Sequence, residues 1–243
     1  MIYLYSGVPG SGKSYHSVTD IIDFLVHKKL YVITNIPLDK DLITKKFKIT
    51  LSELDKKLFI MDNEDITVDF LKRFSVDNLE RGKENQCLLV FDEAGDKFNT
   101  RNWEADDRME WLKFYRVHRH FGYKVILVAQ HDRYLDRQIR GCIQTEIEHR
   151  SFKYYKVFGF ILYYLFGGLF QTISFNYPMK SSQGRKDSKI DASVIKLHKK
   201  YCKLYDTFNC LNDYLKEYES SADAGNGGCV VFNAMGDPLP APK

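Results

Sequence analysis

Four apolar runs, each ending in polar residues or glycine, divide the first 130 residues of the chain. They are IYLYSG at 2–7, LYVITNI at 30–36, CLLVFDEAG at 87–95 and YKVILVAQ at 123–130. Such nearly continuous runs, rich in β-branched and aromatic residues, are typical of strands covered on both faces. The pattern therefore predicts four buried strands in this part of the chain.

Between these strands, apolar residues recur at helical spacing. A helix is expected from Lys13 to about Lys29, a second at ITVDFLKRF (66–74), and a third at 104–121, which has acids in its first turn and bases in its last. Strands that alternate with helices indicate an α/β fold, with a mostly parallel sheet and helices on both faces.

The pattern changes after residue 150. Residues 157–175 carry no charged side chain over about the length that spans a bilayer. Three interpretations stay open: a membrane span, an apolar hairpin that touches the membrane or a subunit interface, and plain core. Gly167-Gly168 would interrupt a single helix, and both flanks are basic, against the positive-inside rule, so the hairpin is favoured.

These changes define four segments. We expect an α/β core at 1–150, the apolar hairpin at 151–180, a basic helical segment at 181–216 that returns to the core, and a disordered Gly/Ala/Pro-rich tail at 217–243.

Composition narrows the class of protein only slightly. The 243 residues are 44% hydrophobic, which allows a sizeable core, and the formal net charge of +4 is too small for a nucleic-acid coat protein. Five scattered cysteines with no CxxC pair indicate reduced thiols rather than a zinc site or disulfide framework. Met1 leads directly into a strand-like run, so no signal peptide is expected.

The first candidate chemistry lies at residues 7–14, GVPGSGKS, which fit G-x-x-x-x-G-K-[ST] between a predicted strand and a predicted helix. Glycines let successive backbone N–H groups converge on phosphate oxygens, and the helix N-terminus adds positive potential. We expect the lysine to reach the β- and γ-phosphates and the serine hydroxyl to bind Mg²⁺. The expected ATP-binding residues are Gly7, Pro9, Gly10, Ser11, Gly12, Lys13, Ser14 and Tyr15.

The second half of the site is expected at the ends of two later strands. Asp92 follows LLVF and would hold Mg²⁺ together with Ser14, while Glu93 would act as general base toward a water molecule. Gln130 closes VILVAQ and could touch the γ-phosphate or orient the water. A glutamate base beside the Mg²⁺ aspartate favours hydrolysis over transfer to a small acceptor.

Basic residues follow in HDRYLDRQIRG, where Arg133, Arg137 and Arg140 have helical spacing. An arginine supplied by a neighbouring subunit can stabilise charge on the γ-phosphoryl group, and we assign this role to Arg137 or Arg140. The alternative for each is a solvated basic helix face.

Together these motifs resemble the Zot-type (zonular occludens toxin, N-terminal domain) ATPases, which include the gene I-type assembly proteins of filamentous phages. The resemblance covers about residues 1–210 and is carried by IYLYSGVPGSGKSY, VITNIP, LLVFDEAG, RVHRHFGYKVILVAQHDRYLDRQIR and HKKYCKLYDTF, in that order. It implies an FtsK/HerA-like P-loop fold and a homo-oligomeric ring, a hexamer, at the cytoplasmic face of the bacterial inner membrane. It also implies phage assembly or coat proteins and single-stranded DNA as partners in ATP-driven phage assembly and export.

Two departures accompany the resemblance. No toxin portion is expected, because the sequence reaches Lys243 with a glycine/proline-rich tail, and no membrane-spanning helix is expected beyond residue 180. Two rival functions also stay open: a P-loop small-molecule or nucleotide kinase, and a nucleotide-gated membrane scaffold without productive turnover. Phosphate release without an acceptor would exclude the kinase, and loss of assembly in Glu93→Gln would exclude the scaffold.

Overall fold

The computed structural model describes residues 1–99, 105–154 and 168–205. In this part of the chain, eight strands form one sheet in the order β3-β2-β4-β5-β1-β6-β7-β8. The strands are β1 (Ile2–Ser6), β2 (Tyr31–Thr34), β3 (Leu58–Ile60), β4 (Cys87–Phe91), β5 (Tyr123–Val128), β6 (Thr145–Ser151), β7 (Leu169–Asn176) and β8 (Lys189–Lys196).

The pairs from β3 through β1 to β6 are parallel, and the pairs β6–β7 and β7–β8 are antiparallel. Parallel strands need long crossovers, which the helices supply. The helical segments are α1 (Lys13–Ile22), a π-helical turn η1 (Asp23–His27), α2 (Lys40–Phe47), α3 (Leu51–Asp55), α4 (Val68–Asn78), α5 (Ala94–Lys97), α6 (Ala105–Val117), the 3₁₀ turns η2 (Asp132–Tyr134) and η3 (Phe152–Tyr154), α7 (Arg137–Arg140), α9 (Tyr177–Gln183) and α10 (Lys199–Cys202).

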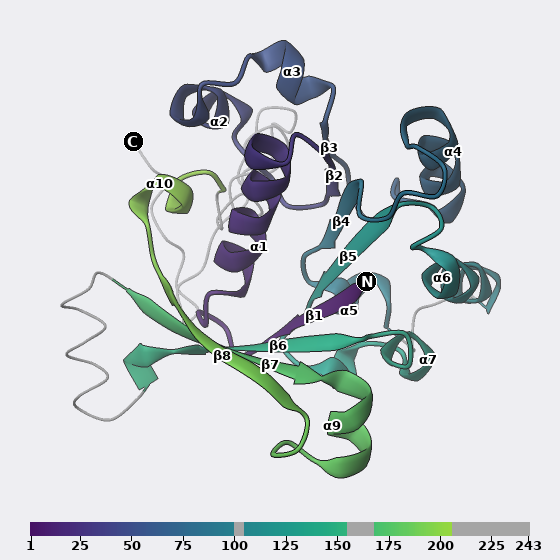
Figure 1. The fold of residues 1–243 in the computed structure, drawn as a ribbon, viewed down its shortest axis with the longest axis vertical. Helices are drawn as coiled ribbons and strands as arrows, with labels where there is room; N and C mark the ends of the chain where they lie inside the picture. Colours follow the sequence, from purple (N-terminus) through teal and green to yellow (C-terminus); the bar gives the residue numbers. More distant parts are fainter. Residues whose placement is uncertain (100–104, 155–167, 206–243) are drawn as a thin grey trace, which may run out of the picture. The chain divides into compact units, whose positions relative to one another are not determined.

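Helices cover both faces of the parallel part (Figure 1). Alternate residues of β4 enter two separate cores: Leu89 and Phe91 pack with α4 and α6, whereas Leu88 and Val90 pack with α1 and η1. A strand that buries both faces needs an apolar residue at every position, which explains the continuous run at 87–91. The prediction of a mostly parallel α/β fold with helices on both faces is confirmed.

The expected boundaries at residues 150 and 180 do not coincide with breaks in the fold. β6 runs through position 150, β7 and β8 continue the same sheet, and α9 connects these two strands. Residues 1–205 form one compact unit. The apolar run expected at 157–175 contributes its end to β7, and residues 155–167 lie outside the described part. No helix within residues 1–99, 105–154 and 168–205 combines the length and apolarity needed to cross a bilayer.

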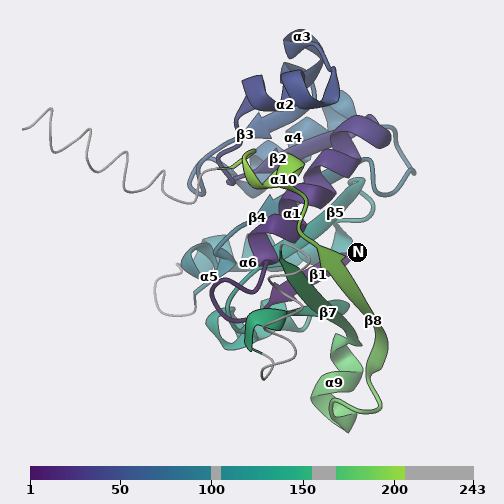
Figure 2. The same ribbon diagram turned by 90° about the vertical axis from the view of Figure 1, so that its left-hand side faces the viewer.

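The structure also corrects the helix expected within 181–216. Residues 189–196 form strand β8, and only Lys199–Cys202 are helical; the expectations for 206–216 and for the tail at 217–243 lie outside the described residues. After β8 the chain returns toward α2, where Asp39 N donates to Leu204 O at 2.9 Å and Leu38 bridges Tyr205 (Figure 2). The return to the core is therefore made by a strand and a single helical turn.

Candidate nucleotide site

The GVPGSGKS loop connects β1 to α1, as expected. Gly12 has φ +93°, and a Cβ at this position would lie 2.8 Å from the Phe170 ring of β7. A Cβ at Gly10 (φ +72°) would meet nothing within 4 Å. Glycine is therefore required at position 12 by both conformation and packing, while the loop at position 10 faces open space that an anion could fill.

Lys13 lies at the start of α1 with its side chain 7% exposed. Its Nζ donates to the carbonyl oxygens of Gly7 (2.8 Å) and Val8 (3.2 Å). Burial lowers the pKa of this ammonium, while the nearby Glu93 and Asp92 carboxylates raise it. Its partners are neutral carbonyl groups, which phosphate oxygens can replace with stronger charge-assisted bonds.

One donor in the loop still lacks a partner. Ser11 Oγ is buried and makes no hydrogen bond within the described part of the chain. The donors at the loop are therefore the unsatisfied Ser11 hydroxyl, next to the helix N-terminus, and the Lys13 ammonium. Together with the open space at Gly10, they fit the phosphates of ATP. Pro9 lies exposed at the start of the loop, and Tyr15 is buried, its hydroxyl accepting from His198 N at 2.8 Å.

Ser14 and Asp92 come together as the sequence predicts. The Ser14 side chain hydrogen-bonds to Asp92; burial raises the pKa of this carboxyl group, and the bond to Ser14 lowers it. A hydroxyl and a carboxylate beside a phosphate-binding loop are the oxygen donors that Mg²⁺ takes in such sites. These two residues would hold Mg²⁺, which would supply positive charge against the phosphate oxygens.

Glu93 and Gln130 also meet. β5 lies between β1 and β4, so its carboxyl end places Gln130 between the loop and the acidic pair. The Gln130 side chain lies beside Glu93, and the pKa of Glu93 is raised mainly by partial desolvation and then by the Asp92 charge. A carboxylate with a raised pKa is a better proton acceptor, which suits the expected general base.

Sequence reasoning missed residues that support the site from neighbouring strands. Asn35, at the end of β2, bonds to the main chain of Asp92, and His149 of β6 contacts Ser6 O next to the loop. Both are polar residues at or near carboxyl ends of parallel strands, and all such ends meet at one edge of the sheet. That rule is the signal that could have identified them.

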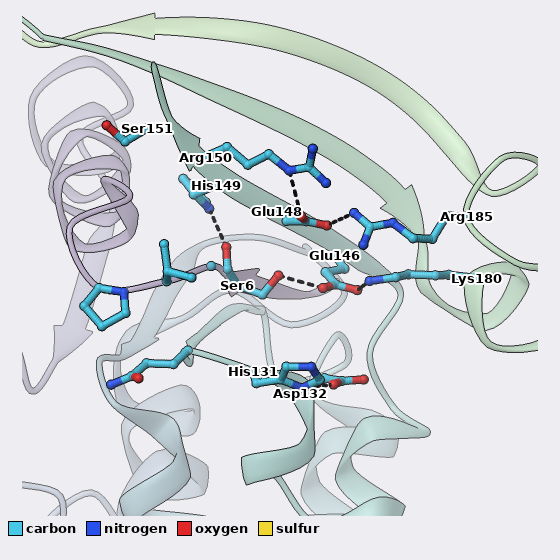
Figure 3. Close-up of a pocket in the computed structure, with 14 residues that line it drawn as sticks. Ser6, His131, Asp132, Glu146, Glu148, His149, Arg150, Ser151, Lys180 and Arg185 are labelled. Atoms are coloured by element: carbon cyan, nitrogen blue, oxygen red, sulfur yellow. Dashed lines mark hydrogen bonds and ion pairs between the residues drawn. The ribbon is translucent and has the colours of Figure 1, made fainter. Parts of the chain in front are cut away.

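A cavity of about 890 Å³ adjoins the loop on the β6 side (Figure 3). Its wall includes the start of the loop (Ser6 to Pro9), the segment 130–132 and the β6 residues Glu146 and Glu148. Glu146 accepts from Ser6 Oγ (2.6 Å) and Lys180 Nζ (2.5 Å), and Glu148 pairs with Arg150 and Arg185. The cavity borders the phosphate site without containing Lys13, Ser14 or Asp92.

The predicted arginines lie elsewhere. Arg137 and Arg140 form the short helix α7, while Arg133 belongs to the separate turn η2, so the expected single helix is two pieces. Arg137 is exposed and Arg140 is half-buried; neither lines the cavity beside the loop. α7 precedes β6, which begins opposite Tyr3 near the start of β1, so α7 lies toward the amino ends of the strands and not at the carboxyl ends that carry the phosphate site (Figure 1).

The chain is similar to Gene 1 proteins of Enterobacteria phages. The Gene 1 proteins of Enterobacteria phages fd and M13 are each 27% identical over 146 residues, which is 60% of this chain and 40% of theirs. The matched region thus spans less than half the length of these relatives.

Three solved structures are similar in fold. The N-terminal domain of zonular occludens toxin from Neisseria meningitidis is 19% identical, with 84% of this chain and 98% of that one covered at a TM-score of 0.48. A structure described as an ATPase domain is 11% identical, with 84% of each chain covered at 0.51, and a DnaB-like replicative helicase is 11% identical, with 82% and 57% covered at 0.52.

The profile of the family described as Zonular occludens toxin (Zot) matches residues 1–209. It covers all of the described fold, from the strand before the phosphate-binding loop to the bridge at Tyr205. The chain belongs to the Zot family and has the fold of the P-loop NTP hydrolases.

Proposed function

We propose that this P-loop NTP hydrolase is an ATP-driven motor for the assembly and export of a filamentous phage. It would act as a homo-oligomeric ring at the cytoplasmic face of the host inner membrane, on single-stranded DNA and phage coat or assembly proteins. Membership of the Zot family and similarity to phage Gene 1 proteins support a role in phage assembly. Location at the membrane, assembly into a ring and action on single-stranded DNA are parts of the proposal that go further than these comparisons.

The observation that carries the hydrolytic part is the cluster at the carboxyl ends of β1, β4 and β5. It unites Lys13, the Ser14–Asp92 pair and a glutamate that lies beside Gln130. A hydrolase needs a base that reaches solvent beside the phosphate site, and Glu93 is exposed. A kinase would need an acceptor pocket from which water is excluded.

The first test is ATP turnover by the purified protein with Mg²⁺ and no acceptor. We expect Glu93→Gln to lower kcat by about 10²–10⁴-fold, because it removes the general base, while nucleotide binding persists. Glu110→Gln, the same change at an exposed position of α6, is the matched control. Unchanged turnover in Glu93→Gln would exclude Glu93 as the base, and no turnover in the unaltered protein would favour the kinase or the scaffold.

Lys13→Ala tests nucleotide binding separately. Loss of one charge-assisted contact, about 1.5–3 kcal/mol, should weaken ATP binding by roughly 10- to 150-fold in calorimetry. Wild-type affinity in this variant would contradict the assignment of the loop.

The partners are tested by adding single-stranded DNA or vesicles of anionic lipid to the turnover assay. Stimulation by DNA, with binding that weakens as salt rises, supports a DNA motor. Sedimentation with vesicles supports contact with a membrane. Absence of both effects would contradict the export proposal while leaving the hydrolase assignment intact.

A further inference from the structure

A side-chain amide continues the β2–β4 ladder beyond its last backbone pair. The register between the two strands ends with Thr34 opposite Val90. Asp92 lies two positions after Val90, just beyond the end of β4. Its N–H donates to Asn35 Oδ1 at 2.7 Å, and its carbonyl oxygen accepts from Asn35 Nδ2 at 2.9 Å. The amide thus pairs with both main-chain groups of Asp92, as a neighbouring strand residue would.

The orientation of this amide is fixed by its partners. Asp92 N–H requires an acceptor and Asp92 C=O requires a donor, which assigns the oxygen and nitrogen of Asn35. The remaining Nδ2 hydrogen donates to Asn63 Oδ1 at 3.0 Å, and Lys97 Nζ donates to Asn63 O. Asn63 follows β3, so two residues that follow strands, Asn35 and Asn63, and one residue of α5, Lys97, hold the turn.

The turn that Asn35 holds is an unusual one. Glu93 adopts φ +44° and ψ +50°, a left-handed conformation that is disfavoured by roughly 1–2 kcal/mol for a residue with a Cβ. A relaxed extended or right-handed backbone here would redirect the Glu93 carboxylate. In the left-handed conformation it meets Gln130, while Asp92 meets Ser14.

We propose that Asn35 is a positioning residue for hydrolysis: its amide holds the Asp92 main chain, and thereby aims Asp92 at the metal and Glu93 at the attacking water. This inference rests on the proposed roles of Asp92 and Glu93. Asn35 itself bonds to main chain and to Asn63 and takes no part in proton transfer. Its effect on the rate passes entirely through the two acids.

Asn35→Ala is the direct test. We expect kcat to fall about 10–100-fold, as for other residues that orient ligands of a metal site, and the Mg²⁺ concentration for half-maximal rate to rise. Affinity for a non-hydrolysable ATP analogue should stay within about twofold, because the loop and Lys13 are untouched. Asn78→Ala, which removes a hydrogen bond to Phe74 O at the end of α4, is the matched control and should leave kcat unchanged.

A double-mutant cycle separates positioning from general support of the fold. Asn35→Ala should lower kcat by a clearly smaller factor in a Glu93→Gln background than in wild type, because one of the two carboxylates that it aims is already gone. The loss that remains should pass through Asp92 and appear as a raised Mg²⁺ requirement. Full, additive losses in the double variant would overturn the proposal. A kcat within twofold of wild type in Asn35→Ala would also overturn it. So would a fall in kcat that equals the fall in the number of sites that bind the analogue, because the variant would then simply contain fewer folded molecules.

Asn35→Asp tests the two halves of the pairing. The carboxylate can still accept from Asp92 N but cannot donate to Asp92 O, so it keeps only one of the two main-chain bonds. Its kcat should therefore fall below that of wild type, and a kcat within twofold of wild type would contradict the proposal. If Glu93→Gln keeps full activity, the proposed site fails; if it is inactive while both Asn35 variants behave as wild type, only this inference fails.

Discussion

His149 and His16 lie side by side behind the first turn of the phosphate-binding loop. His149 Nδ1 is 3.0 Å from Ile147 O and 3.3 Å from Ser6 O, and its Nε2 is 2.8 Å from His16 Nδ1. Carbonyls only accept, so Nδ1 of His149 carries the hydrogen and its Nε2 accepts from His16. The two rings cannot both be protonated, because two N–H groups would then face each other across this 2.8 Å contact.

This pair should make the fold sensitive to acid. Burial lowers the pKa of His149 to about 3 and also lowers that of His16, so the folded state disfavours protons that the unfolded chain accepts near pH 6.5. Stability is therefore complete above pH 6.5 and is lost as the pH falls toward 3. His149 alone should account for about 2 kcal/mol between pH 7.5 and 5.

Chemical denaturation at the two pH values checks this expectation. His149→Gln, whose amide can donate to Ser6 O or Ile147 O and accept from His16, should reduce the difference in unfolding free energy by about 2 kcal/mol. His27→Gln, a change at an exposed residue, should not alter it. Equal pH dependence in both variants would contradict the role assigned to His149.

At the scale of elements, α9 is held against the sheet by two buried polar contacts. Lys180 Nζ pairs with Glu146 Oε2 at 2.5 Å, and Tyr177 Oη donates to Asp132 at 2.9 Å. Glu146 is 3% exposed and also binds Ser6 beside the loop (Figure 3). The helix that follows β7 is thus connected to the start of the phosphate-binding loop through a single buried carboxylate.

Lys180→Met should destabilise the protein by about 3 kcal/mol, because it leaves the Glu146 charge buried without its cation. Adding Glu146→Gln should restore most of this loss, since the neutral amide can still bond to Ser6 and needs no counter-ion. Lys186→Met, at an exposed position after α9, is the control. Urea unfolding measures all three variants, and a double variant no more stable than Lys180→Met would show that the helix depends on something other than this pair.

Strands that are buried on both faces were predicted correctly from the sequence, and less buried strands were not. β1, β2, β4 and β5 were predictable because both faces of each are covered, so their apolar runs are continuous. β8 was mistaken for part of a helical segment because it is an edge strand exposed on almost every residue and lies in a polar, basic stretch of the chain. The alternation of polar and apolar positions in KIDASV, which is typical of a strand, is the signal that could have identified it. β7 was read as part of an apolar segment because its order depends on pairing with β6 and β8, which lie on other parts of the chain.

The same reasoning applies to the site. Lys13, Ser14 and Asp92 were predictable because loop and strand-end chemistry follow local spacing, and the structure brings them together. Asn35 was missed because its partner is the main chain of a residue 57 positions away. The contact exists because β2 and β4 are neighbours in the sheet, and the spacing of residues in the sequence does not reveal which strands are neighbours.

At the scale of the whole molecule, the site lacks an arginine from its own α7. Lys13 supplies a cation at the loop itself. Arg150 and Arg185 of the adjoining cavity pair with Glu148, while Arg137 is exposed on α7. A heterologous, head-to-tail ring would let the exposed helix of one subunit meet the site of the next. This arrangement reconciles the position of Arg137 with the role predicted for it.

Subunit mixing tests this arrangement directly. Glu93→Gln lacks the base for its own site and Arg137→Ala lacks the cation for the neighbouring site, so each variant alone should be inactive. In randomly mixed rings about one interface in four joins an intact Glu93 to an intact Arg137, and turnover should return to roughly a quarter of wild type. The same Arg137→Ala chains mixed with chains that carry both Asn35→Ala and Glu93→Gln should regain as much, because the second chain contributes only its arginine. If Arg137→Ala chains are inactive alone and stay inactive after mixing, the arginine acts within its own subunit. If Arg137→Ala alone is fully active, Arg137 has no part in the mechanism.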